Sequence, residues 1–185
     1  MSIRRLLPSE AAKLGSHLAR LTSEERSLRF MGAMSDEAVR VHCERIDWFR
    51  TAVIGFFDAG VLRGAAELSV DYRQFPLWCE AAVTVEAAWQ AHGVATELLR
   101  RSLVMAQNRR ARGVHIQCFG DNYRMQNVAR KFGAHFRCRS GQCDADILTP
   151  APSCASLYEE ATNESIGWMR CWLDAMTLRA PRSAA

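Results

Sequence analysis

The stretch that decides the fold runs from Cys79 to Ala95 and has the sequence Cys-Glu-Ala-Ala-Val-Thr-Val-Glu-Ala-Ala-Trp-Gln-Ala-His-Gly-Val-Ala. Its apolar, β-branched residues 81–85 predict a buried strand, and the turn Gln90-x-x-Gly93-x-Ala95 opens directly into an amphipathic helix. The first-turn N–H groups of a helix have no partner within the helix and lie at the positive end of its dipole. The order of strand, glycine turn and helix therefore favours a pyrophosphate site, with a simple tight connection as the alternative.

Two familiar phosphate loops do not fit this turn. No Gly-Lys-Ser/Thr follows the strand, so the turn is not a Walker A loop. A dinucleotide fingerprint would need a third glycine and an acidic residue about 20 positions further on, and the sequence has neither in place. The turn thus predicts a phosphate site of another kind.

Hydrophobic patterns on both sides of this stretch predict a mixed α/β fold. Helices are expected after the potential N-caps Ser9 and Ser35, after Gly93, and after Asp121 or Asn122. Because a strand, a helix and another strand follow one another around Gly93, we expect a right-handed crossover between parallel strands. Strands are expected at residues 3–7, 51–57, 62–70, 78–85, 114–119, 135–139 and 143–148.

Several motifs in series resemble one enzyme family. The segments Glu80-Ala-Ala-Val-Thr-Val, Trp89-Gln-Ala-His-Gly-Val-Ala, Gly113-Val-His-Ile-Gln-Cys and Asn122-x-x-Met-x-x-x-Ala129 are similar to those of the GNAT superfamily of acyl-CoA-dependent N-acetyltransferases. More narrowly, they resemble the catalytic domain of bacterial protein-lysine acetyltransferases. The resemblance spans residues 1–148 and implies a mostly antiparallel central sheet flanked by helices.

Residues 149–185 lie outside this resemblance and predict a C-terminal extension with one amphipathic helix over residues 165–178. Ile166, Met169, Leu173 and Met176 lie on one side of that helix, extended by Trp168 and Trp172. Packing of this face on the body of the protein is the favoured interpretation. A homodimer contact and a lid over the acceptor cleft are the alternatives.

The resemblance implies acetyl-CoA as co-substrate and assigns the site residues. Glu80 stands where the family has its general base. The main chain of the central strand would pair with the pantetheine arm and polarise the thioester carbonyl, and the turn would bind the pyrophosphate. The residues implied at the cofactor are Val83, Thr84, Val85, Gln90, Ala91, His92, Gly93, Val94, Ala95 and Asn122, the last as a contact or a helix cap, with Arg124 and Arg130 as candidates for the 3′-phosphate.

The chemistry needs a base, because a lysine ammonium titrates near 10.4 and about one in a few thousand is nucleophilic at neutral pH. Glu80 begins an apolar strand, where burial would raise its pKa toward the working range. Glu67 is the competing carboxylate on a neighbouring strand. Arg26 and Arg29 either orient an acidic feature of the substrate or form surface ion pairs.

Position 129 departs from the family pattern. Many GNAT enzymes have a tyrosine seven residues after the asparagine that matches Asn122, where it acts as the acid for the departing thiolate, and this chain has Ala129.

The expected function is transfer of an acetyl group from acetyl-CoA to a primary amine by direct attack. The resemblance favours a protein lysine as acceptor; a small amine, or a non-catalytic acyl-CoA-binding or interaction module, is the alternative.

Composition is ordinary for a globular domain: of 185 residues, 49% are hydrophobic and 24% charged. The absence of a membrane span or signal-peptide core predicts a cytoplasmic protein, in which the seven cysteines would be reduced thiols. Cys138 and Cys143 form a close pair without a matching His/Cys pair, so no metal site is expected. The net charge of +4 suits a polyanionic cofactor, and no nucleic-acid motif accompanies it.

Overall fold

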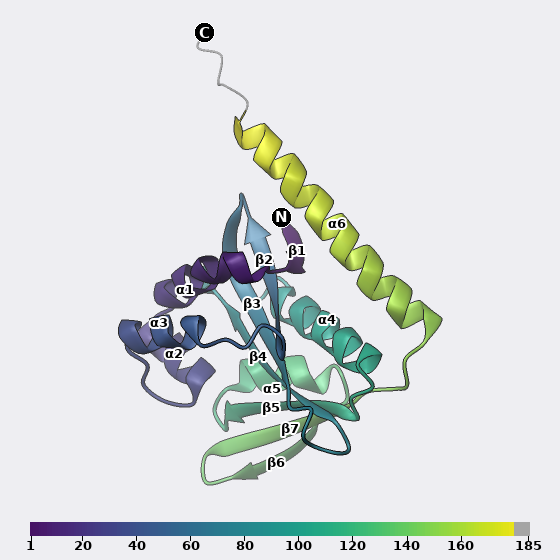
Figure 1. Ribbon diagram of the computed structural model, residues 1–185. Coiled ribbons are helices and arrows are strands. Elements are labelled where there is room, and N and C mark those ends of the chain that lie inside the picture. The colour runs from purple at the N-terminus through teal and green to yellow at the C-terminus, as the bar shows by residue number, and fades with distance from the viewer. Residues whose placement is uncertain (180–185) are drawn as a thin grey trace.

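A seven-stranded sheet forms the centre of the fold and confirms the mixed α/β prediction (Figure 1). The structure is a computed structural model that describes residues 1–179, with side chains to residue 169. The strand order is β1-β2-β3-β4-β5-β7-β6, and every neighbouring pair is antiparallel except β4 and β5. The strands are β1 (Ser2–Arg5), β2 (Thr51–Asp58), β3 (Val61–Val70), β4 (Trp78–Val85), β5 (Gly113–Phe119), β6 (His135–Arg139) and β7 (Gln142–Leu148).

Helices cover both faces of this sheet (Figure 1). On one face, α1 (Ala11–Arg20) and α3 (Asp36–Glu44) pack Leu14, Leu18 and Val39 against β2 and β3. On the other face, α4 (Val94–Asn108) buries Leu98 and Leu99 in the larger apolar cluster. The helix α5 (Tyr123–Arg130) follows β5. Within residues 1–179, no helix is long and apolar enough to cross a membrane.

A short helix, α2 (Ser23–Phe30), was not predicted from the sequence. The Thr22 hydroxyl accepts a hydrogen bond from Glu25 N at 3.1 Å, and the Glu25 carboxylate accepts one from Thr22 N at 2.9 Å. This reciprocal capping box satisfies two amide groups at the helix start. Its signature, Thr-x-x-Glu, is visible in the sequence and identifies the helix.

The C-terminal helix α6 (Cys154–Arg179) begins well before the expected Ser165. A polar stretch was predicted before the helix, whereas in the structure this segment is helical and two of its acidic residues bind α4. Glu159 pairs with Arg100, and Glu160 accepts a hydrogen bond from Asn108 at 2.6 Å. The described part of α6 packs on the body of the protein, but not through the predicted face, because Ile166 is 46% exposed and Met169 is 57% exposed. The side chains of Trp172, Leu173 and Met176 lie outside the described ones.

The seam between α6 and β1 is tight at Gly167. An added Cβ there would lie 2.6 Å from Arg4 Cβ and 2.7 Å from the Ile3 carbonyl oxygen. The buried Arg4 guanidinium forms two hydrogen bonds with Glu10, at 2.6 and 2.7 Å, and its Cζ lies 4.4 Å from the centre of the Trp168 ring. The buried guanidinium of Arg4 on β1 therefore contacts the Trp168 ring of α6 and links these two elements.

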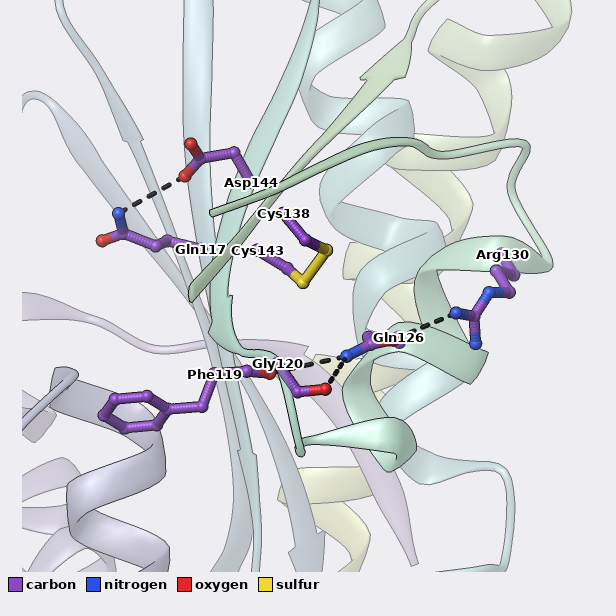
Figure 2. Close-up of a disulfide and its surroundings, with 8 residues drawn as sticks. All are labelled: Gln117, Phe119, Gly120, Gln126, Arg130, Cys138, Cys143 and Asp144. Carbon is purple, nitrogen blue, oxygen red and sulfur yellow. Dashed lines mark hydrogen bonds between the residues drawn. A yellow bond between two sulfur atoms is a disulfide. The ribbon is translucent and has the colours of Figure 1, made fainter. Parts of the chain in front are cut away.

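Cys138 and Cys143 form a disulfide across the β6–β7 hairpin, where they are paired residues (Figure 2). The prediction of reduced thiols is therefore wrong at these two positions. Strand register explains the bridge, because it places the two sulfur atoms side by side on one face of the hairpin. Four other cysteines are free thiols, Cys43, Cys79, Cys118 and Cys154, and Cys171 lies outside the described side chains.

The close approach at Gly167 predicts the effect of a single methyl group. We expect Gly167→Ala to lower the free energy of unfolding by about 1–3 kcal/mol, because the new Cβ meets backbone atoms of β1 that have little room to move. This loss opposes the roughly 1 kcal/mol that alanine gains over glycine in a helix. Urea unfolding measures the change. Ser165→Ala, on an exposed part of the same helix, is the matched control, and an unchanged or raised stability of Gly167→Ala would contradict the packing.

Candidate active site

The site is built around the place where β4 and β5 separate. They pair over three residues only, with Trp78 opposite Gly113, Cys79 opposite Val114 and Glu80 opposite His115. From Ala81 onward, β4 pairs with β3 alone. Figure 1 shows the two strands side by side in the sheet, with α4 lying between them in sequence. The confirmed parallel pair thus opens into a gap toward the end of β4.

Backbone groups of two predicted cofactor residues face this gap. Glu86 N donates to Arg63 O at 2.9 Å, and hydrogen-bonded pairs alternate with non-bonded pairs along an antiparallel ladder. The N–H and C=O groups of Val83 and Val85 therefore point away from β3. Those of Thr84 point toward β3, so Thr84 does not offer its main chain to the gap.

The loop after β4 is held by side-chain contacts. Gln90 donates to the Val85 carbonyl at 2.9 Å and to Glu25 at 3.0 Å, and it accepts a hydrogen bond from Arg124. Gly93, the N-cap of α4, has a φ of +79° and no side chain that caps the helix. The first amides of α4, at Val94 and Ala95, are thus left for a ligand.

His92 and Ala91 complete this loop. The Nδ1 atom of His92 lies 2.6 Å from the Gln90 carbonyl, so Nδ1 carries the hydrogen and donates it. Ala91 adopts a φ of +61°, in the left-handed region. Both residues are exposed, and the structure brings them together with the four other residues assigned to the loop from sequence.

A buried histidine supports the end of β4, and sequence reasoning missed it. His17 on α1 has no exposed surface; its Nε2 lies 2.9 Å from the Thr84 hydroxyl and its Nδ1 lies 3.1 Å from Glu86. Burial lowers the pKa of His17, and the nearby Glu86 carboxylate opposes this only in part. The histidine therefore ties α1 to β4 as a structural link. A lone histidine on an amphipathic helix gives no sequence signal for this contact.

Glu67, the competing candidate base, is held in a buried ion cluster. Its carboxylate accepts hydrogen bonds from Arg29 at 2.7 Å and lies 2.8 Å from His42 Nε2. Burial raises its pKa, but Arg29 and His42 together lower it further, to about 2. A carboxylate with so low a pKa is a poor base, and Arg29 forms an ion pair with it. Arg26 pairs with Asp36 instead.

Glu80 lies on the same sheet face as Glu67 but is exposed, so the prediction of a buried carboxylate is wrong. Its neighbours on β3 and β5 are the partly buried Ser69 and His115, which leave it open to solvent. It borders a groove of about 510 Å³. The groove is lined by Ser69, Asp71, Gln74, Trp78, Cys79, Glu80, His115, Arg137 and Asp146.

On α5, Asn122 acts as the helix cap, because its side-chain oxygen accepts a hydrogen bond from Met125 N at 3.1 Å. Ala129 is 1% exposed and packs in the core, while Tyr123 is 66% exposed. Arg130 donates to Gln126, which in turn binds the main chain at the end of β5 (Figure 2). Of the two arginines assigned to the 3′-phosphate, Arg124 is the one that contacts the loop.

Comparison with solved structures shows the fold of acetyl-CoA-dependent transferases. The GNAT domain of S. lividans PAT is 19% identical, with a TM-score of 0.67 over 79% of this chain and 89% of that chain. A structure of yncA from Salmonella typhimurium with its cofactor acetyl-CoA is 16% identical, with a TM-score of 0.61 over 83% and 98%. A point mutant of a cAMP-binding acyltransferase from Mycobacterium smegmatis is 18% identical, with a TM-score of 0.55 over 91% and 51%.

The sequence itself gives the family. Residues 18–134 match the acetyltransferase (GNAT) family model, so the chain belongs to the acetyltransferase (GNAT) family. A comparison with curated protein sequences gives no match. Acetyl-CoA-dependent acyl transfer is thus the activity of the family to which the site belongs.

The ion cluster at Glu67 predicts a pH-dependent contribution to stability. The folded pKa of about 2 lies below the ordinary 4.5, so the contribution is complete above pH 4.5 and is lost as the pH falls toward 2. We expect Glu67→Gln to lower the free energy of unfolding at pH 7 by about 3 kcal/mol, because Arg29 keeps a largely buried charge without its partner. The difference in the free energy of unfolding between wild type and Glu67→Gln should become smaller as the pH falls from 4.5 toward 2.

Urea unfolding between pH 7 and pH 3 measures this effect. Glu37→Gln removes a fully exposed carboxylate that pairs with Arg40, and it should leave the unfolding midpoint nearly unchanged. Equal effects of the two substitutions at pH 7 would show that the Glu67 cluster does not support the fold.

Proposed function

We propose that this protein is an N-acetyltransferase that moves an acetyl group from acetyl-CoA to a primary amine, with a protein lysine as the favoured acceptor. The observation that carries the proposal is the gap between β4 and β5, which has an uncapped helix start at one end and a carboxylate-lined groove at the other. One end suits an anionic cofactor and the other a cationic amine.

The cofactor end fits acetyl-CoA, which supplies the acetyl group as an activated thioester. The main-chain groups of Val83 and the N–H of Val85 would pair with the amide-containing arm, and the N–H groups of the loop and of Val94 and Ala95 would bind the pyrophosphate. The Val83–Val85 strand edge also provides a fixed N–H donor for the thioester carbonyl. Thr84 contributes by anchoring the strand through His17.

The acceptor end draws an ammonium group through the carboxylates of Asp71, Glu80 and Asp146. Glu80 is assigned as the base for direct attack. Cys79 lies beside it, but burial raises the pKa of this thiol to about 11, so it stays protonated and is no nucleophile at neutral pH. A covalent acetyl-cysteine intermediate is therefore disfavoured.

Protein lysine is favoured over a small amine for two reasons. The sequence motifs resemble those of bacterial protein-lysine acetyltransferases, and the groove is bordered by exposed side chains, including Asp71 and Gln74, which leave room for a polypeptide. Residues 1–148 would form the transferase domain and residues 149–185 an extension that braces it.

A non-catalytic acyl-CoA-binding module is the second candidate. It is favoured by Ala129, whose buried methyl group leaves no acid for the departing thiolate on α5. We give it second place because a CoA thiolate is a good leaving group without a side-chain acid.

Labelled acetyl transfer tests the proposed activity. With labelled acetyl-CoA and a desalted soluble proteome plus its small-amine pool, we expect label in the protein fraction, and a loss of about 10²–10⁴-fold with Glu80→Gln. Glu44→Gln, an exposed carboxylate on α3, is the control and should retain the wild-type rate. Label in the small-molecule fraction would replace the lysine acceptor by a small amine. No label in either fraction, from protein that binds acetyl-CoA, would favour the binding module.

The loop predicts a pH-dependent affinity for acetyl-CoA. His92 stands where the family often has arginine, and an imidazole gains positive charge on acidification between pH 8 and pH 6. We expect binding to be roughly two- to fivefold tighter at pH 6 than at pH 8, the scale of one exposed charge pair. Calorimetric titration of wild type and His92→Gln measures this, the variant correcting for titration of the cofactor phosphate. The same pH dependence in both proteins would refute the role of His92.

A further inference from the structure

A row of polar residues crosses the sheet at the groove. Strand register places Ser69 opposite Glu80, Glu80 opposite His115, and His115 opposite Asp146, on β3, β4, β5 and β7 in turn. Paired residues of neighbouring strands point to the same face and lie about 5 Å apart. All four line the groove, so Glu80 and His115 are neighbours on the same wall.

Asp146 fixes the imidazole of His115. Nδ1 of His115 lies 2.8 Å from Asp146 Oδ1, and Asp146 also accepts a hydrogen bond from Arg137 at 2.6 Å. Partial burial raises the pKa of Asp146, but the contacts with His115 and Arg137 lower it further, so it stays a carboxylate. Nδ1 therefore carries a hydrogen and donates it, and Nε2 is the atom left to accept a proton.

The groove can also hold an imidazolium. Nε2 lies 3.5 Å from Asp144 Oδ1, so a proton on Nε2 would meet a second carboxylate nearby. Glu80, in contrast, is exposed, and no hydrogen bond or ion pair among residues 1–169 holds its carboxylate. No side chain among the described ones thus orients the Glu80 carboxylate, whereas Asp146 orients the His115 ring and Asp144 lies on its other side.

We propose that His115 is the final proton acceptor of the acetyl transfer; this rests on the proposed function. Glu80, the base, takes one proton from the ammonium group of the acceptor and passes it to Nε2 of His115, so that one ammonium N–H bond breaks and an Nε2–H bond forms. The freed lone pair forms the N–C bond while the thioester C–S bond breaks, and the second proton of the attacking nitrogen passes to the departing CoA thiolate, which leaves as the thiol. The imidazolium, between Asp144 and Asp146, later releases its proton to water.

The charged side chains around His115 come from the strands on both sides of β5 and from the helix α2. On this face they are Glu80 from β4, Asp144 and Asp146 from β7, and Arg137 and His135 from β6, the last opposite Asp146, with Asp71 after β3 at the rim. The charged side chains of α2 include Glu25, Arg26 and Arg29, and these bind Gln90, Asp36 and Glu67 in turn. The charged groups that β4 and β7 present to His115 are thus Glu80, Asp144 and Asp146, all of them acidic.

The test is the pH dependence of labelled acetyl transfer to the desalted soluble proteome, with uncatalysed transfer subtracted. His115→Asn keeps a donor at the position of Nδ1 for Asp146 and removes the accepting nitrogen. We expect a loss of about 10²-fold or more at pH 7. The deficit should shrink roughly tenfold per pH unit up to pH 9, as more of the acceptor amines lose their proton unaided. Glu44→Gln, which changes an exposed carboxylate of α3 outside the groove, should keep the wild-type profile.

The outcomes separate this inference from the proposed function. Wild-type transfer that Glu80→Gln lowers, together with a wild-type profile for His115→Asn, would overturn the role of His115 alone. A deficit of the same size at every pH would also overturn it, because His115 would then only position other groups. No transfer by wild type would overturn both. If His115→Asn does not fold, Asp146→Asn gives the second test, with an expected loss of at least tenfold at pH 7 that narrows as the pH rises.

Discussion

The parallel pairing of β4 and β5 over only three residues is the constraint on which the rest of the structure depends. A strand edge buried without partners would cost free energy, because each backbone N–H and C=O group needs a hydrogen bond. At Val83 and Val85 the fold leaves such an edge facing a gap, and one of these groups, the Val85 carbonyl, is taken by Gln90. The early separation of β4 and β5 thus creates the gap. On its other edge, β5 pairs along its full length with β7, so β5 stays part of the sheet.

Buried ionic contacts on the α1–α3 face keep β4 and β3 in place at this opening. His17 links α1 to the end of β4, and Glu67 binds Arg29 of α2 and His42 of α3. These groups resemble catalytic residues by type, but each is committed to a partner inside the protein. The site therefore uses one set of polar residues for rigidity and leaves a second set, along the groove, open to solvent.

The elements could be predicted because their signals are local. Alternating and β-branched residues marked the strands, and Gly93 marked the start of α4. Contacts that depend on strand register could not be predicted, since residues such as His115 and Asp146 are distant in sequence and meet only after β5 and β7 pair. The same holds for the exposure of Glu80. The disulfide was missed for another reason, because Cys138 and Cys143 are close in sequence but a cytoplasmic protein was expected to keep its thiols reduced. The helix α2 had a local signal that was overlooked. The assignments of Glu80 and of the cofactor loop remain predictions, now with defined geometry.

The packing of α6 on β1 has a consequence for folding during synthesis on the ribosome. A ribosome releases residues 2–5 long before residues 154–169, so a nascent chain holds Arg4 and Glu10 without the Trp168 ring and without the Gly167 seam. The edge of the sheet at β1 then stays uncovered until the ribosome has released residues 154–169. Translation that stops early would yield a protein with most of its strands but an open flank, the kind of incomplete product that quality-control proteases and chaperones recognise.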